Sequence, residues 1–320
     1  MKALLLAGGF GTRLRPLTYT RPKHLLPIAN RPHIQHVFDL LRRHDVSRVV
    51  LTTSYLAEAF GEIVDRATTD GMEVKVVHEE VALGTAGALK NAQAEVEDET
   101  FLVFNGDVLT DVDLHALVAF HRERTAEATI LLAPVDDPSS FGVVPTGDGG
   151  RVTGFIEKPP RGEAPTNEIN AGVYVLEPSV LDRIPEGREW SVERALFPEL
   201  VEDGARLFAL PTDSYWMDVG TPDKYLRANM DAIGGRFEMQ AGVALAEDVS
   251  IEATATVTSS CIGAGTKVDA EATVEASVVL SGCKISRGAT VSRSILGEGV
   301  TVAAGVQLVD QTVGDFESAE

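Results

Sequence analysis

The chain has 320 residues, which is enough for one large domain or two smaller ones with an ample core. Its formal net charge is −20, from 48 acidic and 28 basic residues, and such a surface argues against nucleic acid as a partner. No apolar run approaches the roughly 18 residues of a membrane span, and the run after Lys2 is too short for a signal peptide. We therefore expect a cytoplasmic protein without a membrane partner. Cys261 and Cys283, the only cysteines, lack metal-ligand spacing and indicate packing residues in a reducing compartment.

The N-terminal stretch combines an apolar segment with a glycine-rich, basic loop. Residues 3–7 have the length and composition of a buried strand of a parallel sheet. The loop that follows, Gly8-Gly-Phe-Gly-Thr-Arg-Leu-Arg15, allows a polyanion to approach the main-chain N–H groups and adds fixed positive charge. It has neither the Walker spacing nor the GxGxxG order. The pattern favours a phosphate-binding loop, with an ordinary glycine turn as the alternative.

Strands and helices alternate through the first third of the chain. Lys23 lies on a segment that Pro22 and Pro27 keep extended, well placed to reach the same anion as Arg13. Periodicity predicts helices over 34–44 and 58–67, and strands over 48–53, 74–78 and 100–107. Such alternation predicts a mainly parallel sheet with ligands at the carboxyl ends of its strands, where the glycine loop, a turn at Gly84 and Asp107 would converge.

The middle third is less regular, and its acidic residues could have structural roles instead of functional ones. The pattern predicts helices over 113–124, 192–201 and 222–233, and strands over 128–133, 141–144, 152–159, 169–176 and 215–222. Glu157 and Lys158 could be an exposed ion pair worth little energy. Asp218, taken alone, could be a turn or capping residue.

Beyond about residue 240 the chain becomes repetitive. Aliphatic residues recur every six positions, as at Val268 and Val274, with slips of one residue between groups. This period is typical of a parallel β-helix. We expect a catalytic domain over 1–238 and a β-helix domain over 239–320 that serves packing and oligomerisation.

Several short motifs in this order resemble the sugar-phosphate nucleotidyltransferases, a family also called nucleoside-diphosphate-sugar pyrophosphorylases. The resemblance covers nearly the whole chain, and the pattern is most similar to that of mannose-1-phosphate guanylyltransferases. It implies a Rossmann-like, mainly parallel α/β sheet followed by a short left-handed parallel β-helix. The motifs are Gly8–Thr18, Arg21-Pro-Lys23, Leu83–Gly87, Asn105-Gly-Asp107, Glu157-Lys-Pro159, Asn170-Ala-Gly172 and Trp216–Gly220.

The resemblance implies that a sugar 1-phosphate oxygen attacks the α-phosphorus of a nucleoside triphosphate and that pyrophosphate leaves. The nucleophile is already an anion, so positioning and charge neutralisation carry the catalysis. The implied catalytic residues are Arg13, Lys23, Asp107 and Asp218, of which the two aspartates match the carboxylates that bind Mg²⁺. The implied nucleotide-binding residues are Leu6, Ala7, Gly8, Gly9, Gly11, Thr12, Arg13, Lys23, Glu79, Gly84, Thr85 and Asp107. The implied sugar-phosphate-binding residues are Gly142, Glu157, Lys158 and Asn170.

Glu79 bears on the choice of base. It occupies the position, five residues before Gly84, that often faces the base in the family, where thymidylyl- and uridylyltransferases commonly carry glutamine. A carboxylate only accepts hydrogen bonds, and guanine offers it two adjacent donors, N1–H and N2–H₂. Glu79, or its neighbour Glu80, therefore favours GTP and, with the wider pattern, mannose 1-phosphate. If Glu79 is instead a solvated loop acid, dTTP or UTP is the alternative.

Other functions remain open from the sequence. A glucose-1-phosphate thymidylyl- or uridylyltransferase would share the whole site except its base and sugar contacts. An acetyltransferase activity in the β-helix lacks a general base, because the repeats contain no histidine. A non-catalytic subunit that binds a nucleotide sugar is a further alternative, although it would not need both aspartates. We expect a homo-oligomer.

Overall fold

The computed structural model describes residues 1–96, 98–236 and 242–320, which form two compact units. Unit 1 consists of Met1–Gly9 and Val37–Trp216, and unit 2 of Phe10–His36 and Met217–Glu320. The domain boundary expected between residues 238 and 239 lies outside the described residues and stays a prediction. Among the described residues, no helix is long and apolar enough to cross a membrane.

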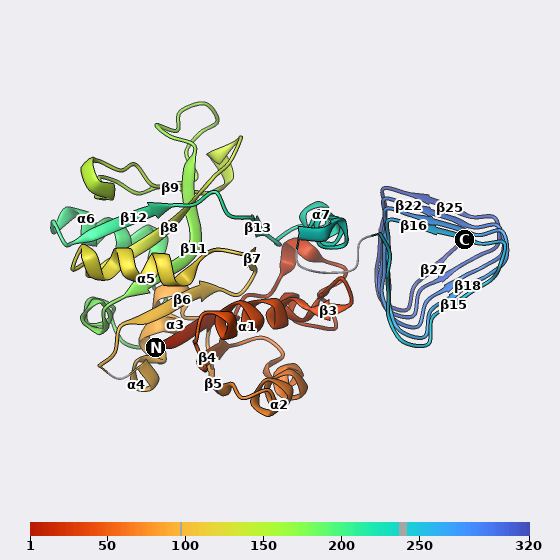
Figure 1. Cartoon of the computed structure of the whole chain (residues 1–320), viewed down its shortest axis with the longest axis horizontal. Coiled ribbons are helices and arrows are strands. Elements are labelled where there is room, and N and C mark those ends of the chain that lie inside the picture. Colours follow the sequence, from red (N-terminus) through yellow and green to blue (C-terminus); the bar gives the residue numbers. More distant parts are fainter. Residues whose placement is uncertain (97, 237–241) are drawn as a thin grey trace. The chain divides into compact units, whose positions relative to one another are not determined.

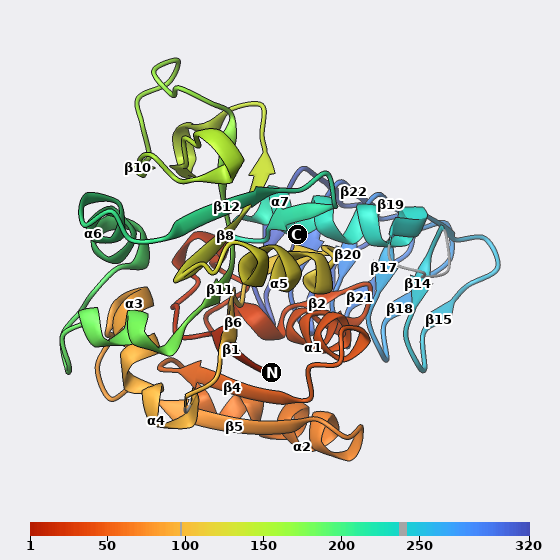
Figure 2. The ribbon, with the colours of Figure 1, turned by 60° about the vertical axis from the view of Figure 1, so that its left-hand side comes forward.

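Four parallel strands form one half of the sheet in unit 1, as the alternating pattern predicts. Their spatial order is β6-β1-β4-β5, and every neighbouring pair is parallel (Figure 2). Continuous burial of β1 and β6 explains their apolar sequences, because both faces of a parallel sheet are covered. The four strands are β1 (Lys2–Leu6), β4 (Arg48–Thr53), β5 (Glu73–His78) and β6 (Phe101–Asn105).

The other half makes this a mixed nine-stranded sheet. β11 runs antiparallel to both β6 and β8, whereas β12 is parallel to β8. β9 and β10 extend the β11 edge. These strands are β8 (Ala128–Pro134), β9 (Gly142–Val143), β10 (Ile156–Glu157), β11 (Glu168–Leu176) and β12 (Leu207–Pro211). The sequence did not indicate β12, whose five residues end on a proline and lie outside the predicted elements.

Helices pack against the sheet and complete the core of unit 1. α2 contacts β5, α3 contacts β1, and α5 contacts β8, β11 and β12. The core joins α3, the central strands and α6, with Tyr174 and Phe197 fully buried and packed edge to face at 5.1 Å between ring centroids. The helices are α1 (His33–Arg43), α2 (Gly61–Thr69), α3 (Gly84–Asn91), α4 (Gln93–Val96), α5 (Leu114–Glu123) and α6 (Phe197–Glu202).

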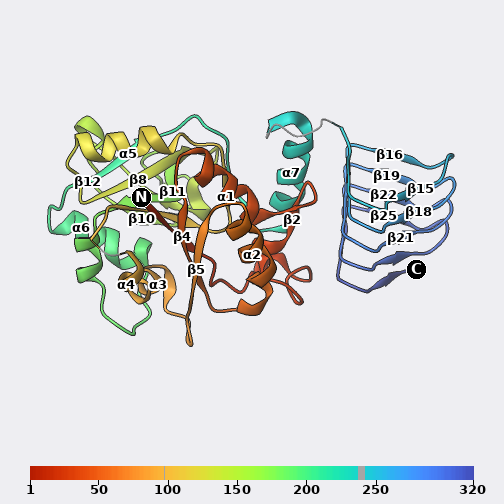
Figure 3. The same ribbon diagram turned by 60° about the horizontal axis from the view of Figure 1, so that its bottom comes forward.

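The C-terminal part of unit 2 is a stack of short parallel strands in three sheets, as expected for the left-handed β-helix (Figures 1 and 3). Successive coils are 17 residues apart, one fewer than three hexapeptides, which explains the one-residue slips in the sequence period. The position equivalent to Ile262 is therefore Val279 and not Leu280. Aliphatic residues from all three sheets fill the interior. The three stacks are β14-β17-β20-β23-β26, β15-β18-β21-β24-β27 and β16-β19-β22-β25, from β14 (Ala244–Leu245) to β27 (Ser318–Ala319).

The rest of unit 2 consists of the segment after the first glycines and helix α7 (Pro222–Asp231). Asn229 on α7 accepts a hydrogen bond from the Ala29 N–H at 2.9 Å, and the Tyr225 hydroxyl donates to the Pro27 carbonyl at 2.6 Å. Arg21 pairs with two acids of the β-helix, Glu298 at 2.6 Å and Asp315 at 3.0 Å. Segment 10–36 is thus held on both α7 and the β-helix.

Candidate functional site

The carboxyl ends of β1, β4, β5 and β6 meet at one edge of unit 1. Backbone hydrogen bonds continue past the strands, from Gly106 N–H to Leu6 at 2.9 Å and from Glu79 N–H to Thr53 at 2.8 Å. They bring Leu6, Ala7, Gly8, Glu79 and Asp107 to this edge, where open α/β sheets bind ligands. The convergence expected from the sequence is therefore present within unit 1.

Glu79 lies against the glycine loop and is only 5% exposed, so it is not a solvated loop acid. Its Oε2 accepts the Leu83 N–H at 3.1 Å. A Cβ added at Gly8 would lie 3.1 Å from its Oε1, so the carboxylate is close against the main chain of the loop. Burial raises the pKa of the carboxyl group, against the Leu83 hydrogen bond, which lowers it. Glu80, the other acid that the sequence offers, is exposed.

Gly84 and Thr85 begin α3 under close constraint. Gly84 has φ +70°, and a Cβ there would lie 2.8 Å from the Trp190 carbonyl oxygen, so both conformation and space require glycine. The Thr85 hydroxyl donates to Glu193 at 2.9 Å and accepts the Val192 N–H at 2.8 Å. This network fixes the turn that follows Glu79.

Asn170 is fixed on β11 beside the end of β6. Its amide donates to the Tyr174 hydroxyl at 2.9 Å, and its Oδ1 accepts the Gly172 N–H at 3.0 Å. Gly172 has φ +71°, and a Cβ there would lie 2.7 Å from Asn105 Nδ2. The close approach brings the motifs 105–107 and 170–172 together.

Gly142, Glu157 and Lys158 lie on the β9–β10 pair. Gly142 is opposite Glu157 in the register, and a Cβ added at Gly142 would lie 3.1 Å from Glu157 Oε2 and 2.7 Å from the Phe155 ring. Lys158 Nζ is 3.5 Å from Glu157 Oε1 and its side chain is 56% exposed, so an anion in solution can reach it.

Within unit 2, the remaining part of the loop packs on its own downstream segment. Gly11 has φ +62°, and a Cβ there would lie 3.1 Å from Lys23 Cβ and from Thr18 Cγ2. The Thr18 hydroxyl donates to the Gly11 carbonyl at 2.8 Å. Lys23 begins a short 3₁₀ turn, Lys23–Leu25. The predicted proximity of Lys23 to the loop is present here, next to the turn that carries Thr12 and Arg13.

Arg13 and Asp218 come together around Gly220 in unit 2. A Cβ added at Gly220 would lie 2.7 Å from both Arg13 Nη2 and Asp218 Oδ1. Lys224 donates to the other carboxylate oxygen of Asp218 at 3.0 Å. Asp218 is therefore not an exposed turn residue, because it is bound by Lys224. It is not the helix cap either, because Thr221 caps α7. It is a carboxylate held among cations.

Ser54, Trp190 and Lys224 support the site and were not found from the sequence. The Ser54 hydroxyl donates to the Gly8 carbonyl, and Trp190 packs against the Gly84 turn. Both lie in irregular segments that have no sequence pattern. Lys224 could have been found, since it stands in the first turn of the helix that follows Asp218. Arg21, which precedes Lys23 in the motif Arg21-Pro-Lys23, is bound by two acids of the β-helix.

The chain matches two family models. The model described as "Nucleotidyl transferase" matches residues 2–234, which is more than half of the chain. A second model, described as "GMPPB C-terminal domain", matches residues 227–317 and so covers the β-helix.

The similar curated proteins include guanylyltransferases for mannose 1-phosphate and a uridylyltransferase for glucose 1-phosphate. A mannose-1-phosphate guanylyltransferase of Mycobacterium tuberculosis is 43% identical over 73% of this chain and 65% of its own length. A probable mannose-1-phosphate guanylyltransferase 2 of Arabidopsis thaliana is 39% identical over 82% and 74%. A UTP–glucose-1-phosphate uridylyltransferase of Synechocystis is 39% identical over 71% and 62%. The matched region thus spans about two thirds of the length of these relatives.

Among solved structures, HddC of Yersinia pseudotuberculosis in complex with GMP-PN has the same fold over the nucleotidyltransferase region. The TM-score is 0.63 and the sequence identity 28%, covering 72% of this chain and 99% of that one.

Proposed function

The chain belongs to the nucleotidyl transferase family, and we propose that it transfers GMP from GTP to mannose 1-phosphate. In this reaction an oxygen of mannose 1-phosphate attacks the α-phosphorus of GTP. The bond between the α-phosphorus and the oxygen that bridges to the β-phosphorus breaks, and the products are GDP-mannose and pyrophosphate. The curated guanylyltransferases support the proposal, and the observation that carries the choice of GTP is the buried carboxylate of Glu79 beside Gly8.

Glu79 recognises the base by hydrogen bonding. One of its oxygens accepts the Leu83 N–H and is therefore oriented by the backbone. Its other oxygen, Oε1, lies on the side of the glycine loop. In its ionised form the carboxylate accepts from guanine N1–H and N2–H₂, the pair of donors that uracil and thymine lack. The elevated pKa of Glu79 means that the ionised form is reached at a higher pH than for an exposed glutamate.

The main-chain N–H groups of the glycine loop bind the nucleotide, and Arg13 and Lys23 neutralise the phosphate charge. Residues Leu6, Ala7, Gly8, Gly9, Gly11 and Thr12 supply the loop, and Gly84 and Thr85 the second wall. Lys158 binds the phosphate of the sugar, while Glu157, Asn170 and Gly142 contact its hydroxyls or the main chain near them. These assignments rest on the chemistry of each residue and on its packing in its own unit, as in the fixed amide of Asn170.

Asp107 and Asp218 are the residues that would supply carboxylates to Mg²⁺. Both are carboxylates, the hard oxygen donors that Mg²⁺ prefers, and Asp218 stands among Arg13 and Lys224, whose charges suit a site for polyphosphate. When bound there, the ion would supply positive charge that offsets the charge on the α-phosphate and on the leaving pyrophosphate. The protein residues position the two substrates in line, and no general base is required because the nucleophile is already an anion.

We place this reaction in the cytoplasm and expect a homo-oligomer that associates through the β-helix. The test of the specificity is a matrix of GTP, UTP, dTTP and ATP against mannose 1-phosphate and glucose 1-phosphate, for the natural chain and for Glu79→Gln. We expect the natural chain to prefer GTP and mannose 1-phosphate, and Glu79→Gln to lose at least tenfold in kcat/KM for GTP relative to UTP. Equal nucleotide preference in both proteins would remove the role of Glu79.

The second candidate is the uridylyltransferase reaction with UTP and glucose 1-phosphate, which the Synechocystis relative favours. It uses the same phosphate and metal residues, so the same matrix distinguishes the two. Preference of the natural chain for UTP with glucose 1-phosphate would establish the alternative.

A further inference from the structure

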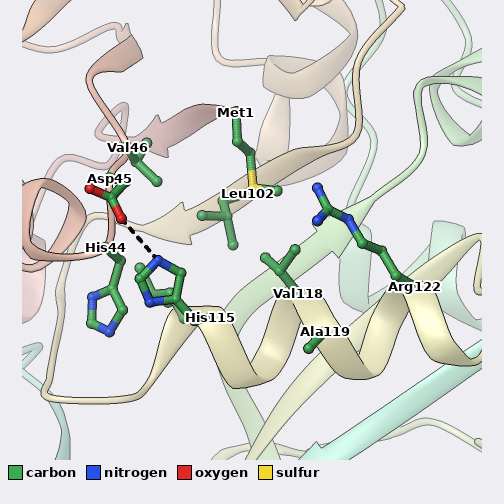
Figure 4. A pocket seen from close by; sticks show the side chains of 10 residues that line it. Met1, His44, Asp45, Val46, Leu102, His115, Val118, Ala119 and Arg122 are labelled. Atoms are coloured by element: carbon green, nitrogen blue, oxygen red, sulfur yellow. Dashed lines mark ion pairs between the residues drawn. The ribbon is translucent and has the colours of Figure 1, made fainter.

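Two histidines and an aspartate meet where helices α1 and α5 come together in unit 1. His44 follows the last residue of α1 and His115 lies in the first turn of α5 (Figure 4), and Asp113 caps α5. Each offers one ligand atom, a ring nitrogen or a carboxylate oxygen, and the three atoms all lie within 4.8 Å of one another. Neither Asp107 nor Asp218 belongs to this group. The cluster is therefore separate from the residues assigned to Mg²⁺.

The hydrogen bonding of His44 directs its second ring nitrogen, Nε2, toward Asp113. Its Nδ1 lies 3.0 Å from the Leu40 carbonyl oxygen, which can only accept, so Nδ1 carries the proton. In the neutral ring, Nε2 then has no proton, and it lies 3.6 Å from Asp113 Oδ1, which also accepts the Ala116 N–H at 3.1 Å. With the imidazole neutral, as it is in a metal ligand, these two acceptors face each other and a cation between them satisfies both. A carbonyl behind the opposite nitrogen is the usual arrangement of a metal-binding histidine.

His115 has a comparable partner behind its ring. Its Nε2 lies 3.3 Å from Asp45 Oδ2, the ion pair marked in Figure 4. A carboxylate in this position fixes the tautomer and orientation of a metal-binding imidazole. The two histidine rings are 5.0 Å apart between centroids and tilted by 58°, so they do not stack face to face. Both rings are therefore oriented by groups outside the cluster.

We propose that His44, Asp113 and His115 form a binding site for a divalent transition-metal ion, with Zn²⁺ as the representative ligand. Two imidazole nitrogens and one carboxylate oxygen suit Zn²⁺, Co²⁺ and Ni²⁺, whereas Mg²⁺ and Ca²⁺ prefer oxygen donors. Ligands of one tetrahedral Zn²⁺ lie about 3.3 Å from each other. His44 Nε2 and Asp113 Oδ1, 3.6 Å apart, are already near this distance, and the remaining pairs, within 4.8 Å, need to close by at most about 1.5 Å. The His115 and Asp113 side chains are 61% and 67% exposed, so no close packing opposes a small adjustment of their positions.

The site has access to solvent and a structural consequence. His44, Asp45 and His115 line a pocket of about 240 Å³, together with apolar residues and Arg122. Three protein ligands leave at least one coordination position, which water from this pocket fills. The ion joins the residue after α1 to the first turn of α5, two helices that are far apart in the sequence. Because it binds the folded chain in preference to the unfolded one, it stabilises unit 1.

The test is a calorimetric titration of ZnCl₂ alone into the full chain, prepared without a histidine tag and stripped of metal beforehand. We expect one equivalent to bind, with affinity reduced at least tenfold in His44→Ala and in His115→Ala. The Asp45→Asn variant should lose about tenfold through its effect on His115. The matched control is His78→Ala, which removes an exposed histidine outside the cluster and should bind as the natural chain does.

A second readout separates ligation from nonspecific binding to an acidic chain. Co²⁺ should give visible absorption bands with the natural chain and with His78→Ala, and these bands should be lost in His44→Ala, whose circular dichroism remains native. Addition of Zn²⁺ should raise the Tm of the natural chain but not that of His44→Ala. Absence of Zn²⁺ uptake by the natural chain, or equal affinity in His44→Ala, overturns the proposal.

Discussion

Gly220 gives the sharpest test of whether Arg13 and Asp218 act as one site. A methyl group in Gly220→Ala would lie 2.7 Å from Arg13 Nη2 and from Asp218 Oδ1, well inside the 3.4 Å at which ordinary contact begins. Both side-chain ends must move by several tenths of an ångström, and Asp218 is also held from the other side by Lys224. Misplacement of catalytic groups by about 1 Å can lower a rate by about a hundredfold. We expect a loss in kcat of this order.

The stability of the fold should change little in this variant. Gly220 does not have a positive φ, so alanine is compatible with its backbone, and the change in the free energy of unfolding should stay within about 1 kcal/mol. The matched control is Gly234→Ala in the same unit, where the new methyl group would have no atom within 4 Å. The assay is pyrophosphate release at saturating substrates, with Tm measured alongside. A Gly220→Ala enzyme with the kcat of the natural chain would refute the reasoning.

Three further predictions follow from buried or paired groups. The raised pKa of Glu79 means that the folded chain holds this proton more tightly than the unfolded chain does. The free energy of unfolding should therefore fall as the pH rises from the ordinary pKa of glutamate to the raised one. Urea unfolding of Glu79→Gln should lack this fall, and the same pH profile in the variant and the natural chain would contradict the prediction. Arg21→Met leaves Asp315, whose side chain is 3% exposed, without its cation, so we expect the free energy of unfolding measured by chemical denaturation to fall by about 3 kcal/mol. Because Lys23 lies on the same segment, we also expect a higher KM for GTP. An unchanged free energy of unfolding would contradict the stabilising role of this ion pair. Burial raises the pKa of the Cys261 and Cys283 thiols to about 12, so a thiol reagent at pH 8 should modify them only after unfolding, and rapid labelling of the native chain would count against their burial.

The parallel strands and the β-helix were predictable because their periodicity is local. Burial on both faces makes β1 a continuous apolar run, and each β-helix coil repeats the same inward positions. The exact coil length was not evident, because a period of six with slips fits the sequence as well as a coil of 17 residues fits the structure. The second half of the sheet was predicted only in part. Strand β12 was not predicted, because it pairs with β8, some 80 residues earlier in the chain, and no local pattern identifies that pairing.

The residues of the candidate site were predictable to the extent that motifs carry them. Glycines at 8, 84 and 220 mark close approaches of other groups to the main chain, and these glycines stand within the motifs that the sequence singled out. What it could not indicate are partners from irregular segments, such as Ser54 on Gly8 and Trp190 on Gly84. The pairing of Arg21 with Glu298 was also hidden, because the two residues are 277 positions apart.

The measurement that tests the account most directly is Mg²⁺-dependent pyrophosphate release from GTP and mannose 1-phosphate, with the sugar nucleotide identified by mass spectrometry. We expect GDP-mannose and pyrophosphate in equal amounts from the natural chain, and a loss of at least a hundredfold in Asp107→Asn, which keeps the shape of the side chain but removes its charge. Nucleotide-sugar binding without pyrophosphate release, or full activity in Asp107→Asn, would contradict the account.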